Sequence, residues 1–267
     1  MTVLVACDLD RTLIYSRKAA QLGEGSVDLV CAEVHNGEQA SFMTAAAAKQ
    51  LGHIVEASTF VPVTTRVVEQ YRRVVLPGAP PQYAIAANGG VLLIDGVEDR
   101  SWTDQVAATL ADGIPLAEVW QHVALVCYPE FTIKVRNAED LFCYAVIQPH
   151  KLPSGFLDRV GGWAAERGWR LSMQGRKLYW MPAPLTKSAA VAEVARRIAA
   201  TRVLAAGDSL LDVDMLLAAD LGIHPRHGEL YEQGWSAPTV ACTQSTGTRA
   251  GEEIVAWFAT ELSAVTR

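Results

Sequence analysis

Cysteine is scarce and scattered in this 267-residue chain. The five cysteines are odd in number, and no two of them form a Cys-x-x-Cys pair. This pattern argues against a disulfide framework and against a zinc site built from thiolates, and it favours a reducing compartment. Long apolar runs are also lacking, since none approaches the ~20 residues of a membrane span. The N-terminus has no basic segment followed by a signal-type apolar core. We therefore expect a cytoplasmic protein with no membrane partner.

The chain also has no excess of positive charge. It contains 23 Lys and Arg against 29 Asp and Glu, a formal net charge of −6, and its pI is about 5.5. This balance gives no indication of a nucleic-acid partner. An anionic substrate would have to be attracted locally, by a metal ion or by individual Lys and Arg side chains. Hydrophobic residues make up 50% and charged residues 19%, which is typical of a globular protein of one large or two modest domains.

Apolar runs alternate with helical patterns in the first and last parts of the chain. The first part is predicted to contain strands, a hairpin turning at Asn36-Gly37 and helices, over residues 3–7, 27–43, 45–51, 59–63 and 67–75. The last part is predicted to contain helices and strands over residues 187–200, 203–206, 210–218, 221–223 and 239–241, with a final helix from residue 251. This alternation predicts an α/β fold with a doubly wound parallel sheet, whose ligands bind at the carboxyl ends of its strands.

The middle of the chain has a different order of elements. Here the sequence predicts strands over residues 83–87, 91–94, 131–135, 141–147, 170–174 and 177–181, and helices over 104–111, 116–126 and 156–167. Helices mixed with paired strands indicate a separate α+β domain inserted into the first one. We therefore expect a core made of residues 1–79 and 183–267, and an inserted domain of residues 80–182.

Two aspartates follow the first predicted strand. Residues 3–7 form a short apolar run typical of a strand covered on both faces, and Asp8 and Asp10 stand at its end. Side chains alternate along an extended chain, so both carboxylates project in the same direction. Neighbouring carboxylates repel one another unless a cation or a proton lies between them. The pair therefore suits a hard cation such as Mg²⁺, and a reaction that needs a nucleophile and a proton carrier.

Further polar side chains stand at expected strand ends or helix starts. Thr64 ends the second strand of the alternating part, Lys187 opens a helix, and Asp208 and Asp212 follow a later strand. Carboxylates, a hydroxyl and a cation at one sheet edge are what Mg²⁺-assisted phosphoryl transfer requires. A Walker-type phosphate loop is not indicated, because residues 183–188 lack the glycines that it needs.

These segments resemble the four ordered motifs of the haloacid dehalogenase superfamily. The matching residues are Asp8-Leu9-Asp10-Arg11-Thr12-Leu13, Thr64-Thr65-Arg66, Lys187, and Gly207-Asp208-Ser209-Leu210-Leu211-Asp212. The insert between the second and third motifs resembles a C2-type cap, and Asn88-Gly89-Gly90 is similar to the Cof-type and sucrose-phosphate-phosphatase-like branches. The resemblance implies a Rossmann-like core and a hydrolase that acts on phosphate esters.

The resemblance also implies a role for each motif residue. Asp8 would be the nucleophile that forms an aspartyl-phosphate, and Asp10 would protonate the leaving alcohol and then deprotonate water. Thr64 and Lys187 would bind the transferring phosphoryl group. The implied cofactor is Mg²⁺.

Its ligands would be the Asp8 carboxylate, the Asp10 carbonyl and Asp208, with Asp212 directly or through water. Substrate contacts are expected from Thr65 and Arg66, which follow Thr64, and from Asn88 and Gly89 at the start of the cap. The implied substrate is a small phosphorylated metabolite, with a phosphosugar or phosphorylated polyol as first choice, and the protein is expected to be a monomer or homodimer.

Two rival functions stay open. A phosphomutase of the phosphomannomutase-like kind would return the phosphoryl group to a sugar. A catalytically weak binding homologue is suggested by Leu211, where relatives usually have Asn, and by the unusual loop over residues 221–234. A metal site at His224 and His227 is weakly indicated, because Pro225 separates them and a third ligand is missing; we expect these histidines in a loop near the cap, in reach of the substrate.

Overall fold

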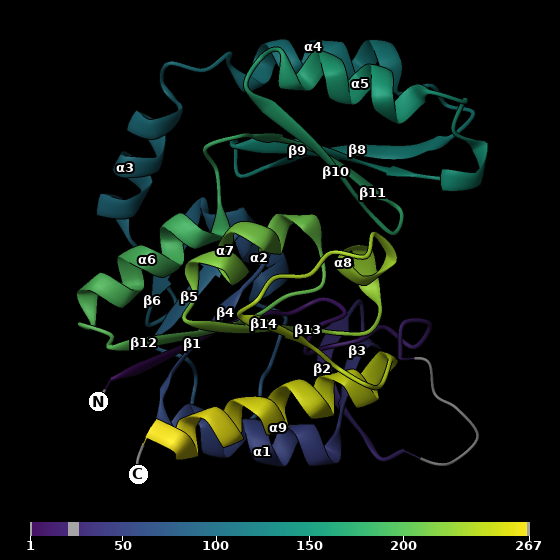
Figure 1. Ribbon diagram of the computed structural model, residues 1–267. Helices are drawn as coiled ribbons and strands as arrows, with labels where there is room; N and C mark the ends of the chain where they lie inside the picture. Colours follow the sequence, from purple (N-terminus) through teal and green to yellow (C-terminus); the bar gives the residue numbers. More distant parts are fainter. Residues whose placement is uncertain (1, 21–26, 266–267) are drawn as a thin grey trace. The chain divides into compact units, whose positions relative to one another are not determined.

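The computed structural model describes residues 2–20 and 27–265 (Figure 1). The chain divides into two compact units, a core unit of residues 1–99 and 187–267 and an inserted unit of residues 100–186. The inserted unit begins at residue 100 and not at residue 80 as the sequence predicted. The physical reason is strand pairing: residues 83–94 extend the sheet of the core unit, so they belong to that unit.

The core unit is built on an eight-stranded sheet with the order β14-β13-β12-β1-β4-β5-β6-β7. Its strands are β1 (Val3–Asp8), β4 (Thr59–Val63), β5 (Tyr83–Ala86), β6 (Val91–Ile94), β7 (Val97–Glu98), β12 (Arg202–Ala206), β13 (Leu221–His224) and β14 (Val240–Cys242). From β14 to β5 neighbouring strands are parallel, and β6 and β7 add an antiparallel edge. The predicted doubly wound parallel sheet is therefore confirmed.

Helices cover both faces of this sheet (Figure 1). Helices α1 (Ala45–Ala57) and α9 (Gly247–Val265) pack together on one face, while α6 (Lys187–Arg197) and α7 (Val213–Ala218) lie on the other. All six residues of β1 are buried, which explains the uninterrupted apolar run that the sequence shows there. Pro62 lies in β4 opposite Cys7 of β1, while β4 pairs with β5 only at Val63 and Ile85.

A hairpin of β2 (Leu29–His35) and β3 (Glu38–Thr44) forms a separate two-stranded sheet. Asn36 and Gly37 at its turn have φ values of 52° and 79°, as a tight two-residue hairpin turn requires. The pairing of the two strands shifts register on both sides of Glu33, so the ladder is irregular at this residue. The hairpin that the sequence predicted over residues 27–43 is confirmed.

The inserted unit contains a four-stranded antiparallel sheet with the order β10-β11-β9-β8. Its elements are α3 (Arg100–Leu110), α4 (Leu116–Val126), β8 (Thr132–Ala138), β9 (Phe142–Ile147), α5 (Phe156–Ala165), β10 (Trp169–Gln174) and β11 (Lys177–Pro182). Helices α4 and α5 lie on one face of this sheet, and Trp169 and Trp180 are buried. The predicted α+β character of the insert is confirmed.

Some predicted helices are shorter or divided. Helix α2 (Val68–Tyr71) ends early because the Val75 N–H donates to the Ala32 carbonyl of the hairpin, which draws the chain out of the helix. The segment predicted as one helix over residues 210–218 is a 3₁₀ turn followed by α7. Among the described residues, no helix has both the length and the apolar character needed to cross a membrane.

The start of α1 provides a test of helix capping. Thr44 is buried, and its Oγ1 accepts a hydrogen bond from the Ala47 N–H at 3.1 Å, which caps the helix. We expect Thr44→Ala to lower the free energy of unfolding by about 1 kcal/mol, because an N–H at the helix start loses its partner. Urea unfolding is the measurement. Thr44→Ser keeps the hydroxyl and is expected to lose less than Thr44→Ala, and equal losses would contradict the capping role.

Candidate active site

Three neighbouring strands of the core sheet bring the predicted motifs together. β1 lies between β4 and β12, and all three run in the same direction. Asp8 ends β1, Thr64 follows β4, and Asp208 stands two residues after β12. Adjacent carboxyl ends of parallel strands form one edge, where open α/β sheets bind ligands.

Lys187 links two of the predicted carboxylates. It is the first residue of α6, its side chain is 1% exposed, and its Nζ donates to Asp8 Oδ1 at 2.6 Å and to Asp212 Oδ1 at 2.5 Å. Burial lowers the pKa of Lys187, but Asp212 and Asp8 outweigh it, so the pKa lies above its usual value. The ammonium is therefore charged, and it holds the start of α6 at the end of β1.

Asp212 is held on both of its oxygens. Its Oδ2 accepts hydrogen bonds from the Asp208 N–H at 3.1 Å, the Ser209 N–H at 2.9 Å and the Ser209 Oγ at 2.7 Å, while Oδ1 accepts from Lys187. This packing needs the preceding Gly207, because a Cβ there would lie 2.4 Å from the Asp212 side chain. Leu211, between these polar groups, is buried and apolar. Asp212 thus orders the turn that presents Asp208.

The site holds more buried negative charge than the nearby cations balance. Carboxylate oxygens of Asp8, Asp208 and Asp212 lie within 4.8 Å of one another, and all three residues are buried. Burial raises the pKa of Asp8 to about 7, although Lys187 acts against this. Burial, together with the charge of Asp8, also raises the pKa of Asp208 well above its usual value. These groups favour a proton or a further cation, so the donor set fits a hard divalent ion.

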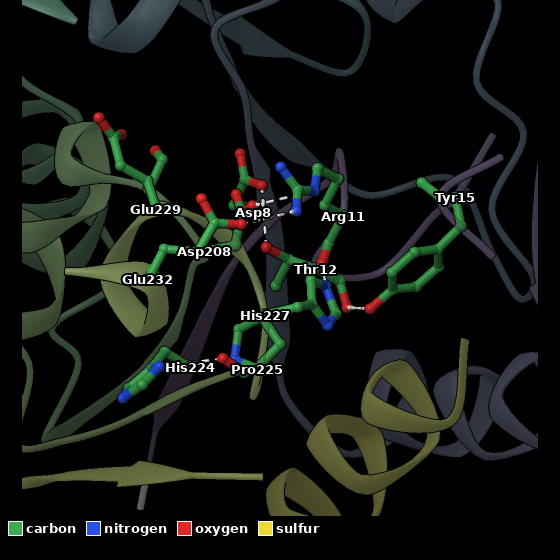
Figure 2. Close-up of polar contacts among 12 residues, drawn as sticks. Asp8, Arg11, Thr12, Tyr15, Asp208, His224, Pro225, His227, Glu229 and Glu232 are labelled. Carbon is green, nitrogen blue, oxygen red and sulfur yellow. Dashed lines mark hydrogen bonds and ion pairs between the residues drawn. The ribbon is translucent and has the colours of Figure 1, made fainter. Parts of the chain in front are cut away.

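Arg11 is a further cation beside Asp208 (Figure 2). Its Nε lies 3.7 Å from Asp208 Oδ2, and its Nη2 lies 3.8 Å from Glu232 Oε1. Its backbone has a φ of 67°, an uncommon conformation for a residue with a side chain. The sequence signal for this residue was present, since an arginine directly follows the second aspartate, but sequence reasoning gave it no role.

His227 connects the Asp8 loop to the start of α9. Its Nε2 donates to the Arg11 carbonyl at 2.7 Å, and its Nδ1 accepts from the Gly247 N–H at 3.2 Å (Figure 2). Burial lowers the pKa of His227, which agrees with a neutral ring that donates once and accepts once. A Cβ on the following Gly228 would lie 2.6 Å from Asp208 Oδ2. In the described part of the chain, the acidic cluster that could hold a metal does not include His224 or His227.

Asp10 is oriented differently from Asp8. Its side chain is 46% exposed, and both of its oxygens accept hydrogen bonds from Arg66, from Nε at 2.7 Å and from Nη2 at 2.8 Å. Thr64 is buried, and its Oγ1 accepts from the Arg66 N–H at 3.1 Å. Thr65 is half-buried next to it. The second motif therefore contacts the first one through Arg66.

Asn88 and Gly89 follow β5, so they stand at the same sheet edge and not in the inserted unit. The Asn88 N–H donates to the Thr64 carbonyl at 2.9 Å, and the side chain is buried. Asn88 and Gly89 have φ values of 56° and 97°, which form a tight turn there. This turn fixes the loop after β4.

Metal binding can be tested through its pH dependence. The raised pKa values of Asp8 and Asp208 mean that the folded, metal-free protein binds these protons more tightly than the unfolded chain. This contribution to stability is present at low pH and is lost as pH rises through about 7 for Asp8. A divalent cation replaces the protons, so we expect Mg²⁺ to raise the melting temperature more at about pH 8 than at about pH 5.

Thermal unfolding with and without Mg²⁺ at the two pH values is the measurement. Asp208→Asn, which removes one negative charge from the cluster, is expected to reduce the shift at the higher pH. Equal shifts at both pH values would contradict the assignment of these carboxylates to the cation.

No model of a protein family and no curated protein sequence matches the chain. Solved structures do match it. The sucrose-phosphatase from Synechocystis, solved with sucrose and phosphate, is 16% identical over 97% of this chain and 99% of its own, with a TM-score of 0.65. A phosphatase of the haloalkanoate (HAD) enzyme superfamily from Bacteroides thetaiotaomicron is 15% identical over 97% of this chain and 96% of its own, with a TM-score of 0.56. A HAD subclass IIB sugar phosphatase is 12% identical over 98% of this chain and 100% of its own, also with a TM-score of 0.56. The chain has the fold of the haloacid dehalogenase superfamily phosphatases, a doubly wound core with an inserted α+β unit.

Proposed function

We propose that this protein is a Mg²⁺-dependent phosphatase that hydrolyses a small phosphorylated metabolite through an aspartyl-phosphate intermediate. The observation that carries the proposal is the grouping of Asp8, Lys187, Asp208 and Asp212 at the carboxyl ends of β1 and β12, with Asp10 two residues beyond the nucleophile. A buried nucleophilic carboxylate, a charged ammonium and a cluster able to hold a cation are the parts that phosphoryl transfer needs.

In the first half-reaction, an oxygen of Asp8 attacks the phosphorus of the substrate. The bond between phosphorus and the ester oxygen breaks, and Asp10 gives its proton to that oxygen, so the alcohol leaves uncharged. Lys187 lies 2.6 Å from Asp8 and offsets the negative charge of the transferring group together with the Thr64 hydroxyl.

In the second half-reaction, water attacks the same phosphorus and Asp10 takes its proton. The bond from phosphorus to Asp8 breaks, which releases phosphate, restores the Asp8 carboxylate and leaves Asp10 protonated for the next cycle. Mg²⁺, when bound, would neutralise charge on the phosphoryl oxygens. Its proposed holders are the Asp8 carboxylate, the Asp10 carbonyl and Asp208, with Asp212 directly or through water.

The proposed substrate class is a phosphosugar or a similar phosphorylated metabolite. Support comes from the neighbours of the same fold, which include a sucrose-phosphatase and a sugar phosphatase. Thr65, Arg66, Asn88 and Gly89 stay predicted substrate contacts, and the inserted unit is proposed to act as a C2-type specificity cap. A cytoplasmic location and a monomer or homodimer also stay predictions. A screen of phosphorylated metabolites with Mg²⁺, read by released phosphate, tests the substrate class.

The screen also separates the two rival functions. A phosphomutase would convert a sugar phosphate into its isomer with little release of phosphate, and a binding homologue would show neither product. Leu211 was the reason to consider a binding homologue. Leu211 is buried, and Asp208 and Asp212 on either side of it in the sequence still join Asp8 in the acidic cluster. We therefore favour the hydrolase.

Asp8→Asn tests the nucleophile. We expect turnover of p-nitrophenyl phosphate to fall by more than about 1,000-fold, because an amide oxygen does not form the intermediate. The fold is expected to persist, since burial already disfavours the charge of Asp8 and the amide has the same shape. Asp28→Asn, at an exposed carboxylate, serves as the matched control. Activity of Asp8→Asn close to that of the control would rule out the covalent mechanism.

Asp10→Asn tests the proton carrier. An alkyl phosphate needs protonation of its leaving oxygen, whereas p-nitrophenolate leaves without it. We expect kcat/KM to fall about 100- to 10,000-fold for an alkyl phosphate and clearly less for the aryl ester. Similar losses for the two substrates would show that Asp10 is not the general acid.

A further inference from the structure

Glu33, in hairpin strand β2, is a buried carboxylate that is contacted by three polar side chains. Its side chain is 5% exposed, and it accepts hydrogen bonds from Ser41 Oγ at 2.8 Å and from Arg73 Nε at 3.2 Å. Arg66 Nη1 lies 2.9 Å from its Oε2, which makes an ion pair. Burial raises the pKa of Glu33, but Arg66, Ser41 and Arg73 outweigh it, so the pKa is lowered and the group is ionised at neutral pH.

The backbone directs this side chain inward. The pairing of β2 with β3 shifts register on both sides of Glu33, and such an irregularity changes the direction in which a side chain points. Glu33 also forms a bridge with Val74, and the neighbouring Ala32 carbonyl accepts from the Val75 N–H at 2.8 Å. The hairpin is therefore fixed to the segment after α2 at the residue that carries the carboxylate.

Arg66 connects Glu33 to the candidate active site. Its side chain is 9% exposed, and its guanidinium contacts Glu33 on one side and both oxygens of Asp10 on the other. A buried guanidinium needs paired charge, so the position of Arg66 depends on Glu33 as well as on Asp10. We propose that Glu33 is a positioning residue that, through Arg66, fixes the orientation of the Asp10 carboxyl for proton transfer. This inference rests on the proposed function of Asp10.

The bidentate pair of hydrogen bonds from the Arg66 guanidinium, which we call the fork, is compatible with proton transfer at Asp10. A carboxylate has about four lone-pair sites, and the two hydrogen bonds from Arg66 use one on each oxygen. The proton that goes to the leaving oxygen, and later the proton of water, binds a lone pair other than these two. Because the Asp10 side chain is 46% exposed, packing alone does not hold it, and the fork restricts its rotation.

Glu33→Gln tests the inference, because it keeps the shape of the side chain and removes the charge that pairs with Arg66. We expect kcat/KM to fall about 10- to 100-fold for an alkyl phosphate, since a misplaced proton carrier slows the step that needs it. For p-nitrophenyl phosphate we expect a loss of less than about 3-fold, because this ester leaves without protonation. Glu38→Gln, at an exposed carboxylate of the same hairpin, is the control and is expected to change neither value. Equal losses of Glu33→Gln on both substrates would overturn the positioning role.

A double variant separates this inference from the proposed function. If Glu33 acts through Asp10, Glu33→Gln is expected to cause no further loss on the alkyl phosphate in an Asp10→Asn background, and additive losses would overturn the inference. If Asp10→Asn itself shows no preference between the two esters, the proposed role of Asp10 fails first. Should Glu33→Gln not fold, Ser41→Ala removes the hydrogen bond that holds Glu33 Oε2 and leaves Arg66 and Asp10 unchanged, and it is expected to show the same selective loss in smaller measure. Equal losses of Ser41→Ala on the two esters would likewise overturn the inference.

Discussion

The buried ammonium of Lys187 is the contact on which the site depends. It bridges Asp8 and Asp212, which lie 179 and 25 residues away in the chain. Without this ammonium, the buried carboxylates at this sheet edge would repel one another with little positive charge nearby to offset them. Removing one partner of such a buried pair commonly costs about 3–5 kcal/mol, so Lys187 stabilises the fold in addition to the role in phosphoryl transfer that is proposed for it. The start of α6, the end of β1 and the turn after β12 are thereby held at one point.

Close backbone approach is the second constraint. A Cβ at Gly207 would collide with Asp212, and a Cβ at Gly228 would collide with Asp208. The two loops can therefore approach these carboxylates only because glycine stands at both positions. Asp212 then uses its own oxygens to order the turn around Ser209. His227, next to Gly228, binds the carbonyl of Arg11 and thereby attaches this loop to the one after β1. The loops around the site are thus fixed by hydrogen bonds to one another and not only by contacts within each loop.

The sequence predicted the part of this arrangement that follows from local rules. Asp8, Thr64 and Asp208 were placed together because each follows an apolar strand, and parallel strands bring their ends to one edge. The boundary at residue 80 was wrong because β5 and β6 form an antiparallel pair, which looks like part of an α+β insert when only the sequence is read. Glu33 was missed because its contacts depend on a register shift in the hairpin and on a pairing with Val74, and neither leaves a periodic signal in the sequence.

Asp8 and Asp10, two residues apart, lie in different environments, which suits the different roles proposed for them. Asp8 is buried against an ammonium, and burial raises its pKa to about 7, so a further cation favours the ionised form that the proposed nucleophile needs. Asp10 lies past the strand end, half-exposed, with both oxygens in the fork of an arginine. The difference arises from the chain leaving β1 at this point: the first carboxylate stays within the sheet, and the second reaches solvent. Different environments for neighbouring carboxyls are how a site separates a nucleophile from a proton carrier. If these roles hold, the hairpin that contacts Arg66 contributes to the proposed reaction as well as the strand that carries Asp8.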